Sequence, residues 1–454
     1  MSRPIIYDLT ELFTGSSGKC SHYGIARVVG EIAARLAELD RGVRFTVFSS
    51  GHSKFFEVFP QLDEGQRPRV WFDIPSSLRP IRFRYIHPQP TPWHRLSCST
   101  VGELVRLGNR IRWRRAGIRL PEISLDGTEF FSAARPKLML DMLAKIHGES
   151  WDTGVTALLH DVFSFHKSVP DRLSRFDVGF IHDTRFVISH ASRLIANSEA
   201  TRRDLEYFAK QNRLPPLPRL TTVPLAHECD EGSERPEIEL PDEPYLLSVG
   251  SLIGRKNLEC AFDAMLTLHE RGRPLPLFVV AGVKREQVVR YLTQPRYDAI
   301  RDRVTFCWNP HQRDLSRLYR SAIALVIPSR LEGWGLPAGE AIWNGTPVLS
   351  STADALREVC GDLAYYFNPD CPAELADQID RLASDSAFRN ATQRRLKLAR
   401  PALRTWNDAA RDLLDTLRDP GKKHQAPFAR NSPSGCLARN EPDTYLSARS
   451  LESM

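Results

Sequence analysis

The segment 322–350 constrains the fold more than any other part of the chain. A short apolar run from Ala322 to Ile327 has the length and β-branching of a buried strand, and Pro328 ends it. A glycine-containing turn, a helical pattern and a second apolar run from Val348 follow. Strand, turn, helix and strand within about thirty residues is the pattern of a βαβ unit. The segment therefore predicts an α/β fold that binds ligands at the carboxyl ends of its strands.

Two glutamates make this segment a candidate ligand site. Glu332 lies in the turn and Glu340 in the predicted helix, and a helix starting near Trp334 would place both on one side of the element. Ionised carboxylates accept several hydrogen bonds and so suit a polyhydroxylated ligand. Gly333 and Gly335 allow close approach of the backbone, and a helix N-terminus favours a diphosphate. The alternative is that the glycines only shape a turn and the glutamates are solvated.

Further candidates follow other predicted strands. Arg255 and Lys256 come after the strand 245–249, where two cations on a strand-to-helix turn suit a diphosphate, although an exposed basic turn is the alternative. The titratable pair His160 and Asp161 follows the strand 157–159, and a structural hydrogen bond would explain it about as well as chemistry would. Gly24 opens an amphipathic helix after the first strand, 5–9.

The length of 454 residues predicts two domains. Residues 229–243 are acidic and contain two prolines, so they are interpreted as the linker between domains 1–228 and 244–400. Residues 401–419 are expected to form a helix that packs back on the first domain, and 420–454 to be disordered. Five prolines between positions 75 and 92 predict that 50–150 consists mainly of loops with short strands.

The net charge of +7 is unevenly distributed. Ten arginines and a single acid, Glu103, lie between Arg79 and Arg119, and a basic helix is predicted from Ser99 to Arg119. One interpretation is an interfacial helix that contacts anionic lipid headgroups or a lipid pyrophosphate. The other is a solvated arginine-rich face with an ordinary packed side. A basic surface also raises nucleic acid as a partner, but no zinc or RNA-recognition motif accompanies it.

The remaining sequence features concern location and cofactors. No apolar run is long enough to cross a bilayer, the acidic N-terminus is unlike a signal peptide, and the cysteines are scattered. We therefore expect a cytoplasmic protein, with peripheral contact at the inner face of the plasma membrane through 79–119. Neither D-x-D nor H-E-x-x-H occurs, so no metal and no cofactor are expected.

Four stretches together resemble one family: VGSLIGRKNLECAFDAM, RVTFCWNPHQRDLSRLYRSAIALVIPSRLEGWGLPAGEAIWNGTPVLSS, LLHDV and YGIARVV. They resemble retaining glycosyltransferases of family four, the group 1 type, which use nucleotide sugars such as GDP-mannose. The resemblance is clear from about 245 to 385 and weaker before it. It implies the GT-B fold, in which two Rossmann-like domains face each other across a cleft.

The resemblance also implies roles for individual residues. Arg255 and Lys256 would hold the donor diphosphate and stabilise the leaving nucleotide. Glu332 would contact the transferred sugar, and Glu340 would bind the ribose. His160 would face the sugar from the first domain, and the loop at Gly24 would approach the diphosphate. Backbone amides complete the implied donor site, at Gly333, Trp334, Gly335 and Leu336. Trp334 departs from the phenylalanine common in the family, and a larger ring there would reshape the donor pocket.

The resemblance implies a retaining hexosyltransferase, and the absence of D-x-D agrees with one that needs no metal. It would move a sugar, with mannose from GDP-mannose favoured, to a growing, lipid-linked polysaccharide or oligosaccharide acceptor. A nucleotide-sugar epimerase of the same fold is the enzymatic alternative, and a basic nucleic-acid-binding protein is the alternative of another class. No nucleic-acid partner is expected on the preferred interpretation.

Overall fold

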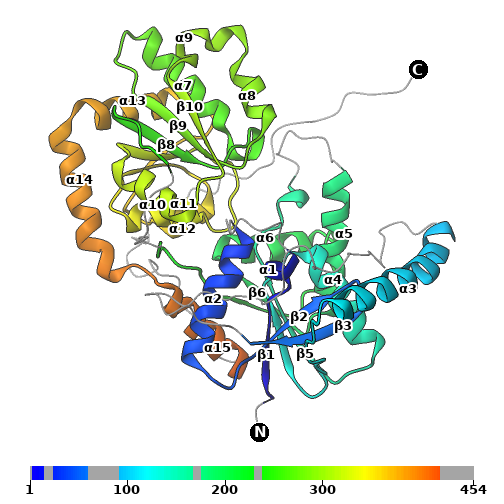
Figure 1. Ribbon diagram of the computed structural model, residues 1–454. Coiled ribbons are helices and arrows are strands. Elements are labelled where there is room, and N and C mark those ends of the chain that lie inside the picture. Colours follow the sequence, from blue (N-terminus) through cyan, green and yellow to red (C-terminus); the bar gives the residue numbers. More distant parts are fainter. Residues whose placement is uncertain (1–2, 15–23, 60–91, 167–174, 230–237, 420–454) are drawn as a thin grey trace.

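The chain forms two α/β halves, each built on one sheet (Figure 1). The computed structural model describes residues 3–14, 24–59, 92–166, 175–229 and 238–419, with side chains left out at 92–99 and 175–177. Most of the predicted linker and all of the predicted disordered tail lie outside these residues, as does the loop before Gly24.

The first half holds a seven-stranded sheet in the order β3-β2-β1-β4-β5-β6-β7, parallel except for the edge strand β3. Its strands are β1 (Ile5–Asp8), β2 (Arg44–Ser49), β3 (Lys54–Val58), β4 (Glu129–Ser132), β5 (Gly154–Leu159), β6 (Arg193–Ala196) and β7 (Arg219–Thr222). The associated helices are α1 (Thr10–Thr14), α2 (Ile25–Leu39), α3 (Pro92–Arg115), α4 (Pro136–Gly148), α5 (Arg175–His190) and α6 (Glu199–Lys210).

The second half holds a six-stranded parallel sheet in the order β10-β9-β8-β11-β12-β13. Its strands are β8 (Tyr245–Val249), β9 (Leu277–Gly282), β10 (Val304–Trp308), β11 (Ala324–Ile327), β12 (Val348–Ser351) and β13 (Tyr365–Phe367). Counted from β8, this is the doubly wound order 3-2-1-4-5-6, whose direction reverses between β8 and β11. The crevice at such a switch point is where doubly wound sheets bind ligands.

The helices of the second half pack on both faces of this sheet (Figure 1). They are α7 (Leu258–Glu270), α8 (Glu286–Leu292), α9 (Asp298–Arg301), α10 (Gln312–Ser321), α11 (Leu336–Trp343), α12 (Asp354–Cys360) and α13 (Pro372–Ser384). The chain then runs along α14 (Ser386–Ala399) to α15 (Trp406–Arg418). The helix α15 lies against α2 of the first half, where Trp406 is fully buried and Arg418 pairs with Asp40.

The interval 50–150 is more helical than predicted. Pro92, one of the five prolines that predict breaks, instead begins α3, and the helix α4, which begins at Pro136, was not predicted. Proline is favoured in the first turn of a helix because its missing N–H has no partner there and its φ is already helical. The other four prolines of the prediction lie outside the described residues. The basic helix itself is confirmed, although it begins at Pro92 and ends at Arg115.

Candidate functional site

The loops after β8 and β11 meet because these two strands are hydrogen-bonded neighbours, with Leu246 opposite Ala324. The first loop forms a short 3-10 turn, η3 (Gly254–Lys256), which carries Arg255 and Lys256. The second loop carries Glu332. The switch point of the second sheet therefore brings together two cations and one carboxylate that lie about seventy-five positions apart in the sequence.

These three side chains form a half-buried ion cluster. The Lys256 ammonium lies 2.6 Å from Glu332 Oε1, and Arg255 Nη1 lies 3.5 Å from Glu332 Oε2. Burial raises the pKa of Glu332, but the positive charges of Lys256 and Arg255 outweigh burial and leave its pKa below the ordinary value. Burial lowers the pKa of Lys256, and Glu332 partly restores it. The cluster holds one positive charge in excess, which suits an anionic group such as a diphosphate.

The first half contributes the segment after β5, which faces this cluster. The Phe163 ring lies 4.3 Å from the guanidinium carbon of Arg255, within the range of a cation–π contact. Burial raises the pKa of Asp161, and the charge of Arg255 opposes that rise. Arg255 is therefore held from both halves, because it also donates to Leu331 O at 2.8 Å.

His160 occupies the position predicted for it, at the carboxyl end of β5, but its ring is buried. Its Nε2 lies 2.8 Å from the backbone oxygen of Ala133 in its own half. Burial lowers the pKa of His160, so the imidazole is neutral at pH 7. The structure brings the backbone of His160, rather than its ring, against the loop that carries Glu332.

Gly333 allows this close approach between the halves. A Cβ atom at Gly333 would lie 2.0 Å from His160 O, a distance that no side chain can occupy. The carbonyl of Gly333 accepts hydrogen bonds from Ser198 Oγ at 2.6 Å and from Thr201 Oγ1 at 3.2 Å. Gly335 has a φ of +99°, and a Cβ there would lie 2.6 Å from Leu356. Both glycines of the turn are thus required by the local geometry.

Trp334 lies between these glycines, and its ring belongs to the hydrophobic core. The indole is buried, its Nε1 donates to Ala226 O at 3.3 Å, and its ring contacts His227. Any donor contact from this position would come from its backbone. Leu336 begins α11, two residues later than predicted, so Glu332 lies outside the helix.

Glu340 lies within α11 and belongs to a separate network. Its Oε1 accepts a hydrogen bond from Arg27 Nη1 of the first half, and its Oε2 accepts one from Tyr319 Oη at 2.7 Å. Gly24 begins α2 with a φ of +57° and is exposed, three residues before Arg27. Each of the two predicted glutamates therefore has its own partners, and each network includes residues of both halves.

Several of these neighbours were not predicted as site residues. Asp161 and Ser198 follow strands β5 and β6, so their position at the carboxyl edge of the sheet was a usable signal. No sequence pattern pointed to Arg27, Phe163 or Tyr319 as site residues. An arginine on an amphipathic helix and isolated aromatic residues are common in any α/β protein. Arg27 and Phe163 act through contacts between the two halves, whereas Tyr319 contacts Glu340 within the second half.

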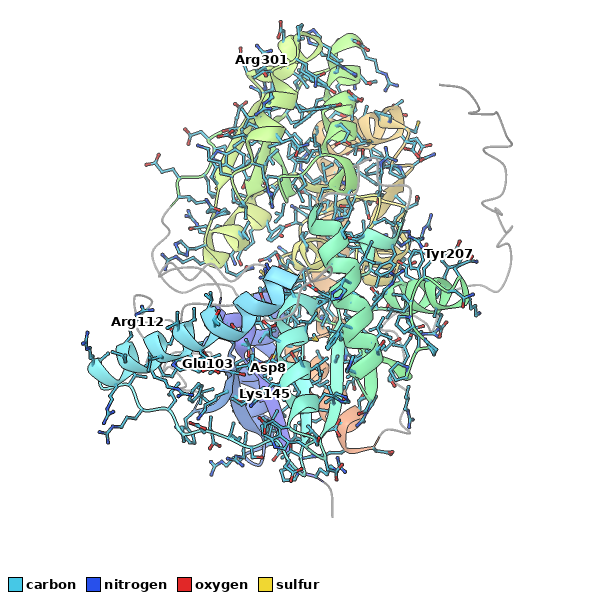
Figure 2. The ribbon with its side chains drawn as sticks, turned by 90° about the vertical axis from the view of Figure 1, so that its right-hand side faces the viewer. Asp8, Glu103, Arg112, Lys145, Tyr207 and Arg301 are labelled. Carbon is cyan, nitrogen blue, oxygen red and sulfur yellow. The ribbon has the colours of Figure 1, made fainter. Side chains whose placement is uncertain are left out.

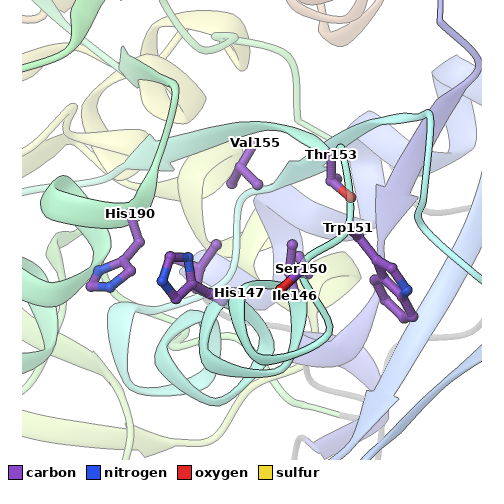
Figure 3. A pocket seen from close by; sticks show the side chains of 8 residues that line it. Ile146, His147, Ser150, Trp151, Thr153, Val155 and His190 are labelled. Carbon is purple, nitrogen blue, oxygen red and sulfur yellow. The ribbon is translucent and has the colours of Figure 1, made fainter.

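A pocket of about 320 Å³ lies elsewhere in the first half (Figure 3). It is lined by the C-terminal ends of α4 and α5 and by Val155 at the start of β5, with His147 and His190 on one side. Because Val155 lies near the start of the strand that His160 follows, the pocket lies at the opposite edge of the sheet from the cluster described above. None of the predicted site residues lines it.

The paired halves have counterparts among solved structures. The structure matches sucrose-phosphate synthase from Thermosynechococcus elongatus with a TM-score of 0.61 and 18% identity, covering 92% of this chain and 98% of that one. It matches WaaG, a glycosyltransferase involved in lipopolysaccharide biosynthesis, with a TM-score of 0.55 and 16% identity over 91% of this chain and all of that one. The fold is therefore GT-B, as predicted: two Rossmann-like domains that face each other.

Sequence comparison relates part of the chain to one family. The family model "Glycosyl transferases group 1" matches residues 230–398. An uncharacterized glycosyltransferase of Methanocaldococcus jannaschii is 31% identical over 183 residues, and the mannosyltransferase WbdA of Escherichia coli is 32% identical over 206. A D-inositol 3-phosphate glycosyltransferase of Xylanimonas cellulosilytica is 28% identical over 299 residues, or 61% of this chain and 69% of that one. Residues 230–398 therefore match the group 1 glycosyltransferases, in the part of the chain where the resemblance was clearest.

The alignments cover only part of the first two relatives. They span 39% of this chain and 45% of the Methanocaldococcus protein, and 42% of this chain and 25% of WbdA. In the part of the chain that the structure describes, no helix combines the length and the apolar character needed to cross a membrane.

Proposed function

We propose that the protein transfers a sugar from a nucleotide-sugar donor to a lipid-linked saccharide, with retention of anomeric configuration. The Arg255–Lys256–Glu332 cluster at the switch point of the second sheet carries this proposal. It places two cations and a carboxylate where doubly wound sheets bind nucleotides, and the first domain packs against it. A diphosphate and a hydroxylated sugar are the ligands that these groups suit together.

The residues have distinct roles in this proposal. Arg255 and Lys256 bind the diphosphate and stabilise the negative charge that develops on the leaving nucleotide, without a metal. Glu332 accepts hydrogen bonds from the sugar hydroxyls, while backbone amides of residues 333–336 approach the donor. The loop at Gly24 approaches the diphosphate from the first domain. The neutral ring of His160 is hydrogen-bonded to the backbone oxygen of Ala133, and this residue forms part of the first-domain surface that faces the sugar.

Mannose from GDP-mannose is the donor that we favour. The relatives WbdA of Escherichia coli and RfbU of Salmonella typhimurium are named as mannosyltransferases, at 32% identity over 42% and 33% of this chain. Other relatives are named D-inositol 3-phosphate glycosyltransferases. A thermal-shift screen with GDP, UDP and ADP sugars tests the choice, because a ligand at 100 times its Kd stabilises a protein by about 2.7 kcal/mol. Stabilisation by GDP-mannose alone is expected, and stabilisation by none of these sugars would contradict the proposed function.

An epimerase of the same fold is tested by incubating the protein with the donor alone. Conversion of the donor to an isomeric nucleotide sugar would replace the transferase proposal. Transfer of labelled sugar to a lipid-linked acceptor, lost on Glu332→Gln, would support it.

Peripheral contact with an anionic membrane through α3 is the remaining part of the proposal. The helix projects from the first domain, and Glu103 and Arg112 are labelled on it in Figure 2. Asn109 and Trp113 face the protein, where Trp113 packs on His52 and Phe56. Exposed apolar side chains recur three or four residues apart on another face: Val101, Leu104, Leu107 and Ile111. Arginines adjoin them in the last turn, at 112, 114 and 115.

An outward apolar face beside arginines suits an interfacial helix on anionic lipid. The described residues include ten exposed large hydrophobic side chains, and these are four of them. The exposed apolar surface is therefore concentrated on α3. We expect the protein to float with vesicles of phosphatidylglycerol but not of phosphatidylcholine. Leu104→Gln with Leu107→Gln should abolish flotation, whereas Leu398→Gln, at an even more exposed leucine on α14, should not. Equal flotation of both variants would contradict this contact.

A further inference from the structure

The network around Glu340 links a residue of the first domain to the predicted ribose site. The carboxylate is 5% exposed and the Arg27 side chain 6%, so the pair is buried between α2 and α11. Each carboxylate oxygen receives one hydrogen bond, from Arg27 on one side and from Tyr319 on the other. An ionised carboxylate has about four acceptor positions, two on each oxygen. These two contacts leave one acceptor position on each oxygen unused.

Arg27 is itself held by the first domain. Its Nη2 donates to Glu228 O at 3.2 Å, and its guanidinium carbon lies 5.9 Å from the Trp406 ring of α15. Its Nε lies 3.9 Å from Glu31, one turn further along α2. The guanidinium cannot rotate away without losing these contacts, so it holds Glu340 in one orientation for as long as the two domains are in contact.

We propose that Arg27 is a positioning residue for nucleotide binding, one that presents the Glu340 carboxylate to two adjacent ribose hydroxyls when the domains are together. This inference rests on the proposed function. It adds that the first domain, and not only the second, determines recognition of the nucleotide. A ribose has two neighbouring hydroxyls, and two acceptor atoms on one fixed carboxylate match that pair.

A competing arrangement makes the opposite prediction. If Arg27 occupied the position of the ribose, it would have to leave Glu340 before the nucleotide bound, and removing it would strengthen binding. If Arg27 positions Glu340, removing it weakens the binding of ribonucleotides and leaves 2′-deoxynucleotides little affected. The ratio of the two affinities separates the possibilities, and a merely structural role would change both affinities equally.

The test compares the binding of GDP and 2′-deoxy-GDP, or UDP and 2′-deoxy-UDP if the screen selects uridine, by calorimetry. The wild-type protein should prefer the ribonucleotide about tenfold, the usual effect of one hydrogen bond to a charged group. Arg27→Lys and Tyr319→Phe should reduce that preference to about two- or threefold. Tyr319→Phe keeps the aromatic ring in the core, so it can replace Arg27→Lys as the test variant if that variant does not fold.

Arg35→Met is the matched control. Arg35 is a second buried arginine on α2 that pairs with Glu31 and Glu228 and makes no contact with Glu340. Its variant should keep the full tenfold preference. An unchanged preference in both Arg27→Lys and Tyr319→Phe, or tighter ribonucleotide binding by Arg27→Lys, would overturn the inference. Failure of the wild-type protein to bind any nucleotide would instead overturn the proposed function.

Discussion

At the scale of single residues, the buried pair Lys256–Glu332 combines binding with stability. Lys256→Met removes the ammonium and leaves the Glu332 carboxylate, 8% exposed, with Arg255 at 3.5 Å. Arg255 still balances the charge, but the carboxylate loses a hydrogen bond from a charged donor, so we expect the free energy of unfolding to fall by about 1.5–3 kcal/mol. Denaturant unfolding measures this change, and transfer assays should show that most activity is lost.

The double variant Lys256→Met, Glu332→Leu separates the loss of stability from the loss of transfer activity. Because both charges are removed, stability should return toward the wild-type value while transfer stays lost. Asp370→Asn provides the control, since it breaks the exposed pair with Arg330 in the same region and should cost less than about 1 kcal/mol. A double variant that transfers sugar normally would show that these charges do not serve the donor.

Gly333 gives a second prediction at this scale. In Gly333→Ala the added methyl group would meet His160 O, a backbone atom that cannot move aside alone. We expect a loss of at least about 2 kcal/mol in the free energy of unfolding, with weaker contact between the domains. Gly345→Ala is the control, because its nearest neighbour lies 3.6 Å away and only its φ of +77° is unfavourable, at about 1–2 kcal/mol. Equal losses in the two variants would contradict a specific role for Gly333.

At the scale of elements, α12 of the second domain caps α6 of the first. The Glu358 carboxylate accepts hydrogen bonds from the backbone N–H groups of Glu199 at 2.9 Å and Ala200 at 3.2 Å. Burial raises the pKa of Glu358 to about 7; the two backbone hydrogen bonds and Arg203 oppose that rise, and the charge of Glu199 adds to it. The folded protein therefore binds a proton at Glu358 more readily than the unfolded chain does.

The pH dependence of stability follows from this difference. Because the folded pKa lies above the ordinary value of about 4.5, the contribution of Glu358 is fully present below pH 4.5 and is lost as the pH rises through 7. Glu358→Gln keeps an acceptor for the N–H groups and cannot ionise. The difference in unfolding free energy between variant and wild type should grow in favour of the variant from pH 5 to pH 8, by at most about 1.4 kcal/mol per pH unit. A variant that is less stable than the wild type at pH 8 would show that α6 favours the charged carboxylate.

The sequence predicted the elements of the second domain well, and for a physical reason. Its strands are short apolar runs bounded by glycine, proline or polar residues, so the strand 245–249 was placed within its true bounds. In 50–150 the prediction of loops was wrong, because Pro92 begins a helix instead of breaking one and the helix α4 was not recognised. Local pattern shows where proline stands but not whether a helix begins there.

At the scale of the whole molecule, the candidate site depends on contacts that no local pattern contains. Arg255, Lys256 and Glu332 could be chosen from the sequence because each follows a strand. That Glu340 would contact Arg27, more than three hundred residues earlier, could not be predicted, because it depends on how the two domains pack. The sequence predicts the ligand-binding loops, and the packing of the domains determines which side chains meet there.

The path of the chain after α13 makes the stability of the first domain depend on the C-terminal helix. Trp406 of α15 is fully buried, and its Nε1 donates to Glu228 O at 3.1 Å. Arg193 of β6 donates to Thr416 O at 2.7 Å, so α15 also contacts the sheet of the first domain. Residues at opposite ends of the described chain thus share one core.

Trp406→Ala should consequently destabilise the first domain although the residue follows the second in sequence. Loss of a buried tryptophan costs about 3–5 kcal/mol, and the cavity would lie between α2 and α15. Hydrogen exchange should therefore accelerate in β1 and α2 well before it does in β8 and β11. Leu398→Ala is the control, since Leu398 is 83% exposed on α14 and its loss should change neither domain. Faster exchange confined to the second domain would mean that α15 contributes to that domain instead. Because Arg27 packs on Trp406, the same variant should also weaken nucleotide binding, which links the C-terminal helix to the candidate donor site.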